Sequence, residues 1–182
     1  MLVAEAHATG ILGQELSGAC ESLGVKHQTP IRLGTLSKAF GGQGGFVACP
    51  RIVADYIVNH CRPLIYRTGL SLPAVEAAIA ALDHVDEMKR RRDRVCHAAG
   101  LVRDRMNLAA DGLERNVPII PVVLGSDKSV VSASQKLRAR GLFVPAIRPP
   151  TVPEGQARLR ISLSFDHTDS MIQQLIDGLQ SI

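Results

Sequence analysis

The sequence has few aromatic residues and no tryptophan. Phe, Trp and Tyr together make up 3% of the 182 residues, so the chain lacks the platforms on which proteins stack single-stranded nucleic acid. Its formal net charge is only +4, and much of the positive charge lies in one run from Lys89 to Arg92. We interpret this run as a basic helix face and expect no nucleic-acid partner.

Cysteine is also scarce. Its four copies are far apart and form no CxxC pair: Cys20, Cys49, Cys61 and Cys96. This spacing is neither that of a zinc motif nor that of a disulfide framework, so we expect no metal site and a reducing, cytoplasmic location.

Long apolar runs are missing as well. No stretch reaches the about 20 residues that a membrane-spanning helix needs. The start of the chain, MLVAEAHATG, lacks the basic and apolar segments of a signal peptide. We therefore expect no membrane partner.

The first part of the chain has the pattern of an α/β domain. Short apolar runs at MLVA, PIRLGTL and GGFVACP predict three strands, the first of them buried. RIVADYIVNHC has helical spacing, RPLIYRTGLSLP is irregular, and Pro73 suits the first turn of a helical stretch that continues to Asn107. Apolar residues thin out in this stretch after Leu82, so we divide the chain into domains at residues 1–92 and 93–182.

The second part of the chain predicts a small α+β domain. VPIIPVVLG and LFVPAIRPPTV predict extended segments, and ARLRISLSF alternates apolar and polar residues as a half-buried strand does. SVVSASQKLRARG predicts an amphipathic helix that ends at Gly141, and DHTDSMIQQLIDGLQSI predicts a capped terminal helix. The order strand, helix, strand, strand, helix can form a core of its own.

One lysine has unusual neighbours. In GTLSKAFGGQGGF, residues 34–46, Thr35 and Ser37 precede Lys38 and four glycines follow it. Glycines let a backbone approach a ligand closely, hydroxyls can donate to an anion, and a lysine amine can clamp phosphate or form a Schiff base. A glycine-rich surface turn with an ordinary lysine has the same local composition, so both interpretations stay open at this point.

Familiar nucleotide motifs do not explain the lysine turn. A Walker loop places glycine directly before the lysine, and a dinucleotide fingerprint needs a third glycine and a following helix. Neither pattern is present in residues 34–46. The remaining groups suit a phosphorylated carbonyl compound, with amine chemistry at one end and phosphate at the other.

Four separated segments together resemble a known family. AEAHATGILG, GTLSKAFGGQGGF, RPLIYRTGL and IRPPTVPEGQARLRISLSFDHT occur in this order, and the chain resembles the α-oxoamine synthases, which are pyridoxal 5'-phosphate (PLP) enzymes of the aspartate aminotransferase fold (fold type I). The resemblance implies an α/β chain, made of the C-terminal part of a PLP-binding large domain and a small C-terminal α+β domain. It also implies PLP as cofactor and a homodimer that shares its active sites.

The resemblance implies roles for particular residues. Lys38 matches the lysine that forms the Schiff base with PLP and moves the substrate proton, and His7 matches the histidine beside the cofactor ring. Thr35 matches a phosphate-side hydroxyl, with Ser37 adjacent to it. Thr68 matches a threonine that reaches the phosphate of the neighbouring subunit.

A sixth residue, Arg160, matches the arginine that binds the amino-acid carboxylate, for which a bidentate guanidinium is well suited. Taken without the family, His7 could be a buried core histidine, and Arg160 could be a surface arginine that shares a strand face with Arg158.

The implied reaction is the decarboxylative condensation of an amino acid with an acyl thioester. Within the family, the resemblance of AHATG implies L-alanine with pimeloyl-CoA, or its carrier-protein thioester, to give 8-amino-7-oxononanoate for biotin biosynthesis. Glycine with acetyl-CoA and serine with a long acyl chain remain alternatives, and so does a non-catalytic subunit.

Two departures from the family pattern stand out. The aspartate that usually precedes the histidine by three positions, and that pairs with the pyridine nitrogen, is Ala4 here. Glu5 follows, but on a strand it points to the opposite face. The chain also begins where the family pattern is about half over, so we expect a gene fragment, a truncated chain, or a subunit whose partner chain supplies the N-terminal half.

Overall fold

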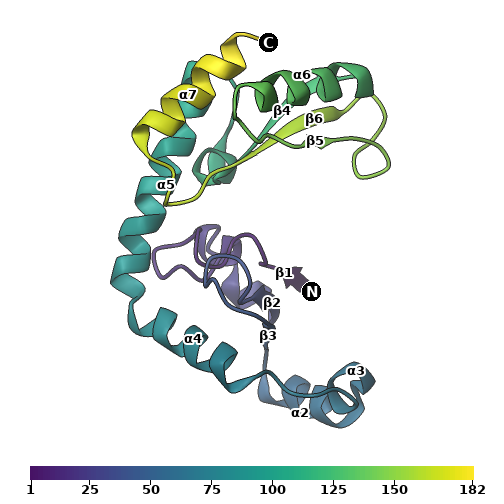
Figure 1. Cartoon of the computed structure of the whole chain (residues 1–182). Helices are drawn as coiled ribbons and strands as arrows, with labels where there is room; N and C mark the ends of the chain where they lie inside the picture. The colour runs from purple at the N-terminus through teal and green to yellow at the C-terminus, as the bar shows by residue number, and fades with distance from the viewer. The chain divides into compact units, whose positions relative to one another are not determined.

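The computed structural model describes residues 1–182, apart from the side chain of Asn116 (Figure 1). The chain forms two compact units, Met1–Arg90 and Arg91–Ile182, which we call the first and second units. The division falls inside one helix, α5, which spans Val85–Arg105.

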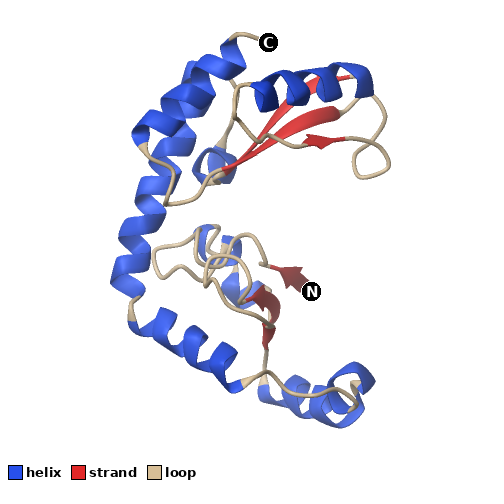
Figure 2. Ribbon diagram, in the orientation of Figure 1, coloured by secondary structure: helices blue, strands red, loops and turns tan.

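The first unit contains a three-stranded sheet in the order β1-β2-β3. Its strands are β1 (Leu2–Ala4), β2 (Ile31–Thr35) and β3 (Gly45–Ala48). β1 runs parallel to β2, with Val3 opposite Arg32, and β2 runs antiparallel to β3, with Thr35 opposite Gly45. All three predicted strands are present (Figure 2). The turn between β2 and β3 carries Lys38.

The prediction that β1 is buried was wrong. Leu2 is 56% exposed and Ala4 is also exposed, whereas Glu5, directly after the strand, is only 2% exposed. The face of β1 that carries Leu2 and Ala4 is therefore open within the first unit. The opposite face is the buried one, because successive side chains of a strand alternate between the two faces.

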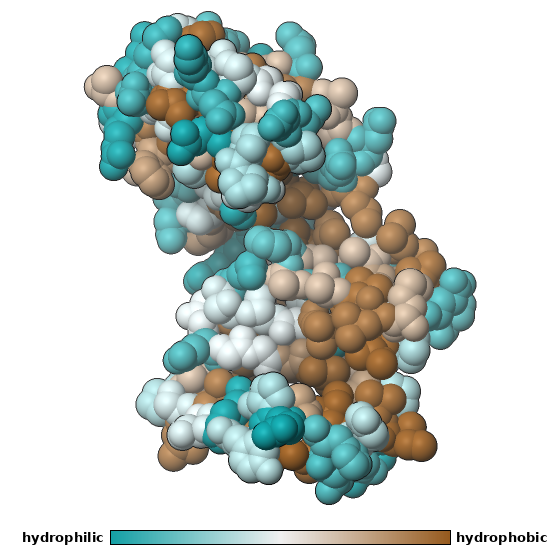
Figure 3. All heavy atoms as spheres, turned by 90° about the vertical axis from the view of Figure 1, so that its right-hand side faces the viewer, coloured by the Kyte–Doolittle hydropathy of each residue, from teal (hydrophilic) through white to brown (hydrophobic). Residues whose placement is uncertain are grey.

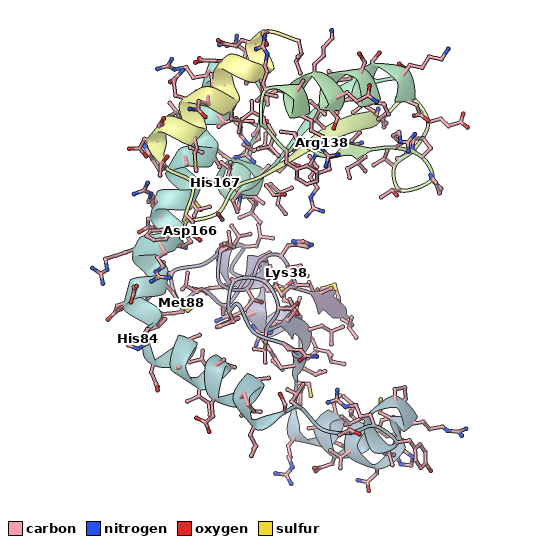
Figure 4. All side chains as sticks on the ribbon, viewed as in Figure 1. Lys38, His84, Met88, Arg138, Asp166 and His167 are labelled. Atoms are coloured by element: carbon pink, nitrogen blue, oxygen red, sulfur yellow. The ribbon has the colours of Figure 1, made fainter. Side chains whose placement is uncertain are left out.

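The helices of the first unit follow the loops and strands. They are α1 (Ala19–Ser22), the 3-10 helix η1 (Lys26–Gln28), α2 (Arg51–His60), α3 (Arg62–Ile65), α4 (Leu72–Asp83) and the start of α5. The sequence predicted one long helical stretch, but His84, with φ −105° and ψ 32°, separates α4 from α5 (Figure 4). No glycine or proline marks this break, so composition did not reveal it.

Much of the first unit's apolar side-chain surface is exposed. Neither α2 nor α3 contains a buried residue. Ile52 and Tyr66 are each 79% exposed, and apolar side chains gather on the surface of this unit (Figure 3). The amphipathic pattern of α2 therefore predicted the helix correctly, while its apolar face has no cover within this unit.

The second unit is a three-stranded antiparallel sheet covered by helices. The strands are β4 (Ile119–Gly125), β5 (Ala146–Ile147) and β6 (Ala157–Ser162), in the order β4-β6-β5. The helical segments are the end of α5, η2 (Gly112–Asn116), α6 (Asp127–Ala139) and α7 (Asp169–Gln180). This is the element order that the sequence predicted.

The second unit has a continuous apolar core. On β6 the side chains alternate as predicted, with Leu159 and Ile161 buried and Arg158 and Arg160 partly exposed. The buried face packs against α5, α6 and α7 through a cluster of apolar residues: Ala99, Val102, Ile120, Val130, Ala133, Leu137, Val144, Ala157, Leu159, Ile161, Ile172, Leu175, Ile176 and Leu179.

Side-chain caps begin two helices of this unit. The hydroxyl of Ser126 accepts a hydrogen bond from the backbone N–H of Ser129 at 3.1 Å, and that of Thr168 accepts one from Met171 N–H at 3.3 Å. Each satisfies an N–H group that has no partner inside its helix. The predicted cap of the terminal helix is thus confirmed, and Gly141, with φ +80°, follows α6 as predicted.

None of the described helices combines the length and apolar character required to cross a membrane. Among the described side chains, no group of three or more His, Cys, Asp or Glu residues could hold a metal ion.

Candidate functional site

Lys38 lies on a closed loop between β2 and β3 (Figure 4). Two backbone hydrogen bonds close the base of this loop: Leu36 N–H donates to Gly44 O at 2.9 Å, and Gly42 N–H donates to Leu36 O at 2.7 Å. A third, from Gly41 N–H to Lys38 O at 3.0 Å, tightens the turn beside the lysine. The lysine side chain is exposed, so its amine is open to a ligand.

The two hydroxyls near Lys38 form a pair. Thr35 Oγ1 and Ser37 Oγ are 2.8 Å apart, and Thr35 Oγ1 donates to Gly44 O at 3.1 Å while accepting from Ser37 N–H at 3.2 Å. With the Thr35 hydrogen directed to Gly44, the Ser37 hydroxyl donates to Thr35. The pair therefore has to reorient before either hydroxyl can donate to an anion.

Internal packing explains two glycines of the lysine loop. A Cβ atom at Gly34 would lie 2.1 Å from Phe46, and one at Gly44 would lie 2.8 Å from Leu70. Gly41, by contrast, has φ +63° and no atom within 4 Å of the place where a Cβ would lie. Close approach to a ligand is therefore not needed to explain Gly34 and Gly44.

A second loop packs directly against the lysine loop. His7 lies exposed in the turn after β1, and three residues later Gly10 adopts φ +83°. A Cβ at Gly10 would lie 2.3 Å from the Cβ of Ala39, the neighbour of Lys38. His7 and Lys38 are 31 positions apart in the sequence. The tertiary structure brings their two turns into contact through Gly10 and Ala39.

The other two predicted site residues lie on different elements. Thr68 is exposed in the segment between α3 and α4 of the first unit, and Arg160 lies on β6 of the second unit. Arg158, on the same strand face, donates from Nε to Gln156 O at 2.9 Å. Among the described residues no such bond is found for the guanidinium of Arg160, and its binding of a carboxylate stays a prediction.

Two carboxylates that had no predicted role in the site organise the loop after His7. Glu5 accepts hydrogen bonds from the backbone N–H groups of Ala19 and Cys20, each at 2.8 Å. Burial raises the pKa of the Glu5 carboxyl, but the bonds from Cys20 and Ala19 outweigh burial and hold the pKa below its ordinary value. A glutamate directly after an apolar strand indicates a carboxylate that needs hydrogen-bond partners, but it does not indicate which partners.

Glu21 plays a similar part in the same loop. Its carboxylate accepts from Glu15 N–H at 2.8 Å and from the N–H and hydroxyl of Ser17 at 3.0 and 2.7 Å. Burial again raises the pKa, but these hydrogen bonds and the charge of Lys26 outweigh it and lower the pKa to about 2. Gly13 leaves room for this carboxylate, because a Cβ there would lie 2.1 Å from Glu21 Oε2.

The donor set fits one end of a PLP molecule. An amine at Lys38 suits the aldehyde, and the hydroxyls of Thr35 and Ser37 suit the phosphate. The ring nitrogen has no carboxylate partner on the open face of β1, because Ala4 offers a methyl group and Glu5 is turned to the buried face and occupied. The chain therefore fits the aldehyde and phosphate ends and lacks the ring-nitrogen partner.

Comparison with known proteins covers almost the whole chain. The family model for aminotransferase class I and II matches residues 1–179. The 8-amino-7-oxononanoate synthase of Lysinibacillus sphaericus is 36% identical over 185 aligned residues, which include 100% of this chain and 47% of the relative. That of Anaeromyxobacter dehalogenans (strain 2CP-C) is 40% identical, with 100% and 46% covered.

Solved structures show the same likeness. A serine palmitoyltransferase of Sphingomonas wittichii matches with a TM-score of 0.89 at 27% identity, over 99% of this chain and 46% of that one. The 8-amino-7-oxononanoate synthase of Francisella tularensis matches with a TM-score of 0.83 at 28% identity, over 99% and 53%. The chain spans about half the length of the curated relatives that it matches. It belongs to the aminotransferase class I and II family, in the α-oxoamine synthase branch of that family.

Proposed function

We propose that this chain forms the lysine-bearing part of a PLP-dependent acyltransferase that joins L-alanine to pimeloyl-CoA, or to the carrier-protein thioester, with loss of CO₂. The product is 8-amino-7-oxononanoate. The observation that carries the proposal is the exposed Lys38 beside the hydroxyl pair of Thr35 and Ser37. The whole of this chain matches about half the length of 8-amino-7-oxononanoate synthases. A homodimer, or a partner chain that supplies the remainder of the fold, would complete the site.

Each proposed residue has a chemical task. Lys38 would hold the cofactor through its amine and carry the substrate proton, while Thr35 and Ser37, with Thr68 of a neighbouring subunit, would bind the phosphate. His7 would lie at the ring oxygen, and Arg160 would bind the amino-acid carboxylate. PLP, when bound, supplies an electron sink for the carbanion that the condensation needs.

Labelling with PLP tests the proposal. The purified chain is mixed with PLP, its visible absorption is recorded, the complex is reduced with borohydride, and the modified lysine is mapped by mass spectrometry. We expect the label on Lys38 and its loss in Lys38→Ala, with Lys128→Ala, on α6 of the second unit, as the matched control. Label spread over surface lysines would contradict the proposal.

Substrate choice is a separate question with its own assay. Alanine, glycine and serine are offered with pimeloyl, acetyl and long-chain thioesters, and CO₂ release is measured. We expect alanine with the pimeloyl thioester to give the highest kcat/KM. A preference for glycine with acetyl-CoA, or for serine with a long acyl chain, would reassign the chain within the same branch.

A second candidate function, a subunit with little or no catalysis of its own, is favoured by Ala4. The ring nitrogen stays protonated more readily beside a carboxylate, and Ala4 supplies none while Glu5 faces the other way. If the chain is catalytically weak for this reason, Ala4→Asp in the assembled enzyme raises kcat. An unchanged kcat in Ala4→Asp would remove this explanation.

A further inference from the structure

Glu5 uses every one of its polar groups to join separate segments of the first unit. Its backbone N–H donates to Leu33 O on β2 at 2.7 Å, which fixes the end of β1 on the strand that leads to Lys38. Its side chain is almost fully buried, with 2% of the residue exposed. A buried carboxylate is costly unless it is hydrogen-bonded, so its contacts indicate what the residue does.

The carboxylate of Glu5 holds the far end of the loop that begins at His7. It accepts from Ala19 N–H and Cys20 N–H, and a Cβ at Gly18 would lie 2.5 Å from its Oε2 atom. Gly18 has φ +122°, so glycine is required there by both conformation and space. The loop is thereby closed back onto the end of β1.

The backbone carbonyl of Glu5 holds the near end of the same loop. It accepts three hydrogen bonds, from Ala8 N–H at 2.9 Å, from Thr9 N–H at 2.8 Å and from Thr9 Oγ1 at 3.0 Å. His7 lies inside the turn that these bonds define. The next residue after Thr9 is Gly10, which packs against Ala39 beside Lys38.

We propose that Glu5 is a positioning residue that fixes the His7 turn against the Lys38 loop. The inference rests on the proposed function for the roles of His7 and Lys38, and on the geometry alone for the contact between their loops. Arg32 of β2 places a positive charge near the carboxylate and, together with the bonds from Ala19 and Cys20, lowers the pKa of Glu5. Glu5 thus stays ionised and able to accept both backbone N–H groups.

Glu5→Gln tests this role with little change in size. The amide turns an NH₂ group toward one of the two backbone donors, so at least one of the bonds to Ala19 and Cys20 is lost. Glu21→Gln is the matched control, because Glu21 binds the middle of the same loop at Glu15 and Ser17. Glu5→Asp, which keeps the charge, is the conservative variant.

Two measurements on the full chain decide the outcome. Amide hydrogen exchange, followed by mass spectrometry without cofactor, should rise at least about tenfold in Glu5→Gln at Ala19 and Cys20, because their N–H groups lose their acceptor. It should also rise at Gly10, whose N–H donates to Leu16 O inside the loop that the carboxylate closes. Glu21→Gln should leave those amides within about twofold of the wild type. With PLP added, the pH profile of the visible absorption at Lys38 should shift in Glu5→Gln, remain unchanged in Glu21→Gln and be partly restored in Glu5→Asp.

The two proposals fail in different ways. If Gly10 exchanges equally in Glu5→Gln and the wild type, or if Glu21→Gln has the same effect as Glu5→Gln, the positioning role is overturned. If Lys38 takes up no PLP in the wild type, the proposed function fails while the exchange data still decide the role of Glu5. Should Glu5→Gln not fold, as judged by circular dichroism, Glu5→Asp carries the same comparison with Glu21→Asp.

Discussion

The two units of the chain bury their apolar residues to very different degrees. The second unit has one continuous core over β4, β5 and β6, whereas the described apolar residues that the first unit buries are Leu12, Leu16, Cys20 and Ala78. The first unit instead relies on hydrogen-bonded carboxylates to shape the loop that carries His7. The second unit thus holds together by apolar packing, whereas the first carries the proposed cofactor lysine on polar, exposed loops.

The largest expected effect of a single substitution lies in the core of the second unit. Leu159 is completely buried on β6, so Leu159→Ala should lower the free energy of unfolding by about 2–5 kcal/mol through lost burial and a residual cavity. Leu72→Ala in the first unit, where the residue is 78% exposed, should change it by less than about 0.5 kcal/mol. Urea denaturation checks both, and equal effects would contradict the division between the units.

Arg103 is a buried charged residue that hydrogen-bonds to backbone carbonyls of the second unit. Its guanidinium donates to the carbonyl oxygens of Arg115, Val117 and Ile119 at 3.2, 2.7 and 3.1 Å, and burial lowers its pKa. Arg103→Met keeps much of the stem but leaves these carbonyls without their donor, and should cost about 2–4 kcal/mol. Thermal unfolding measures the loss.

The matched control for this change is Arg105→Met, two residues along on the exposed side of α5, which should unfold within a few degrees of the wild type. An equally small change in Arg103→Met would show that water replaces the guanidinium at those carbonyls.

Acid should destabilise the first unit by protonating the carboxylates of Glu5 and Glu21. Both have pKa values below the ordinary value of 4.5 in the folded state, so their stabilisation is present above that value and is lost as the pH falls through each lowered pKa, which for Glu21 is about 2. For Glu21 the contribution is on the order of 1–2 kcal/mol, reduced by its partial exposure to solvent. Glu21→Gln should flatten the pH dependence of loop hydrogen exchange between pH 4.5 and 2. A dependence as steep as in the wild type would assign the effect to other carboxyls.

Removing helix caps should give the smallest change in stability, and the change should differ between the two units. Ser126→Ala and Thr168→Ala each remove a side-chain cap in the second unit and should cost about 1 kcal/mol in chemical denaturation. Ser71 begins α4 in the first unit without a side-chain cap bond, so Ser71→Ala should cost less than about 0.5 kcal/mol. A loss at Ser71 as large as at Ser126 would indicate a cap that forms in solution.

Local sequence patterns predicted most of the elements. The alternation in ARLRISLSF predicted both β6 and its buried face, and the spacing of apolar residues predicted α2, α6 and α7. The short helix α3 was missed, because four residues that include Pro63 give no period to detect. The break at His84 was missed for a similar reason, since neither glycine nor proline marks it.

The candidate site was predictable only in part. Lys38, Thr35 and Ser37 are neighbours in sequence, so their proximity follows from chain connectivity, while the roles of His7, Thr68 and Arg160 remain predictions from the family resemblance. The contact between Gly10 and Ala39, and the network of Glu5, could not be read from local pattern, because they join residues far apart in the chain.

The sequence by itself determined the family, the order of the helices and strands, and the absence of a carboxylate at Ala4, because each depends on residue identity and local spacing. Only the tertiary structure decided that Glu5 faces the buried side and is fully engaged, that Gly34 and Gly44 serve internal packing, and that β1 and α2 expose apolar side chains. These features depend on which distant segments meet, and hydrogen bonding and burial between such segments are settled only when the chain folds.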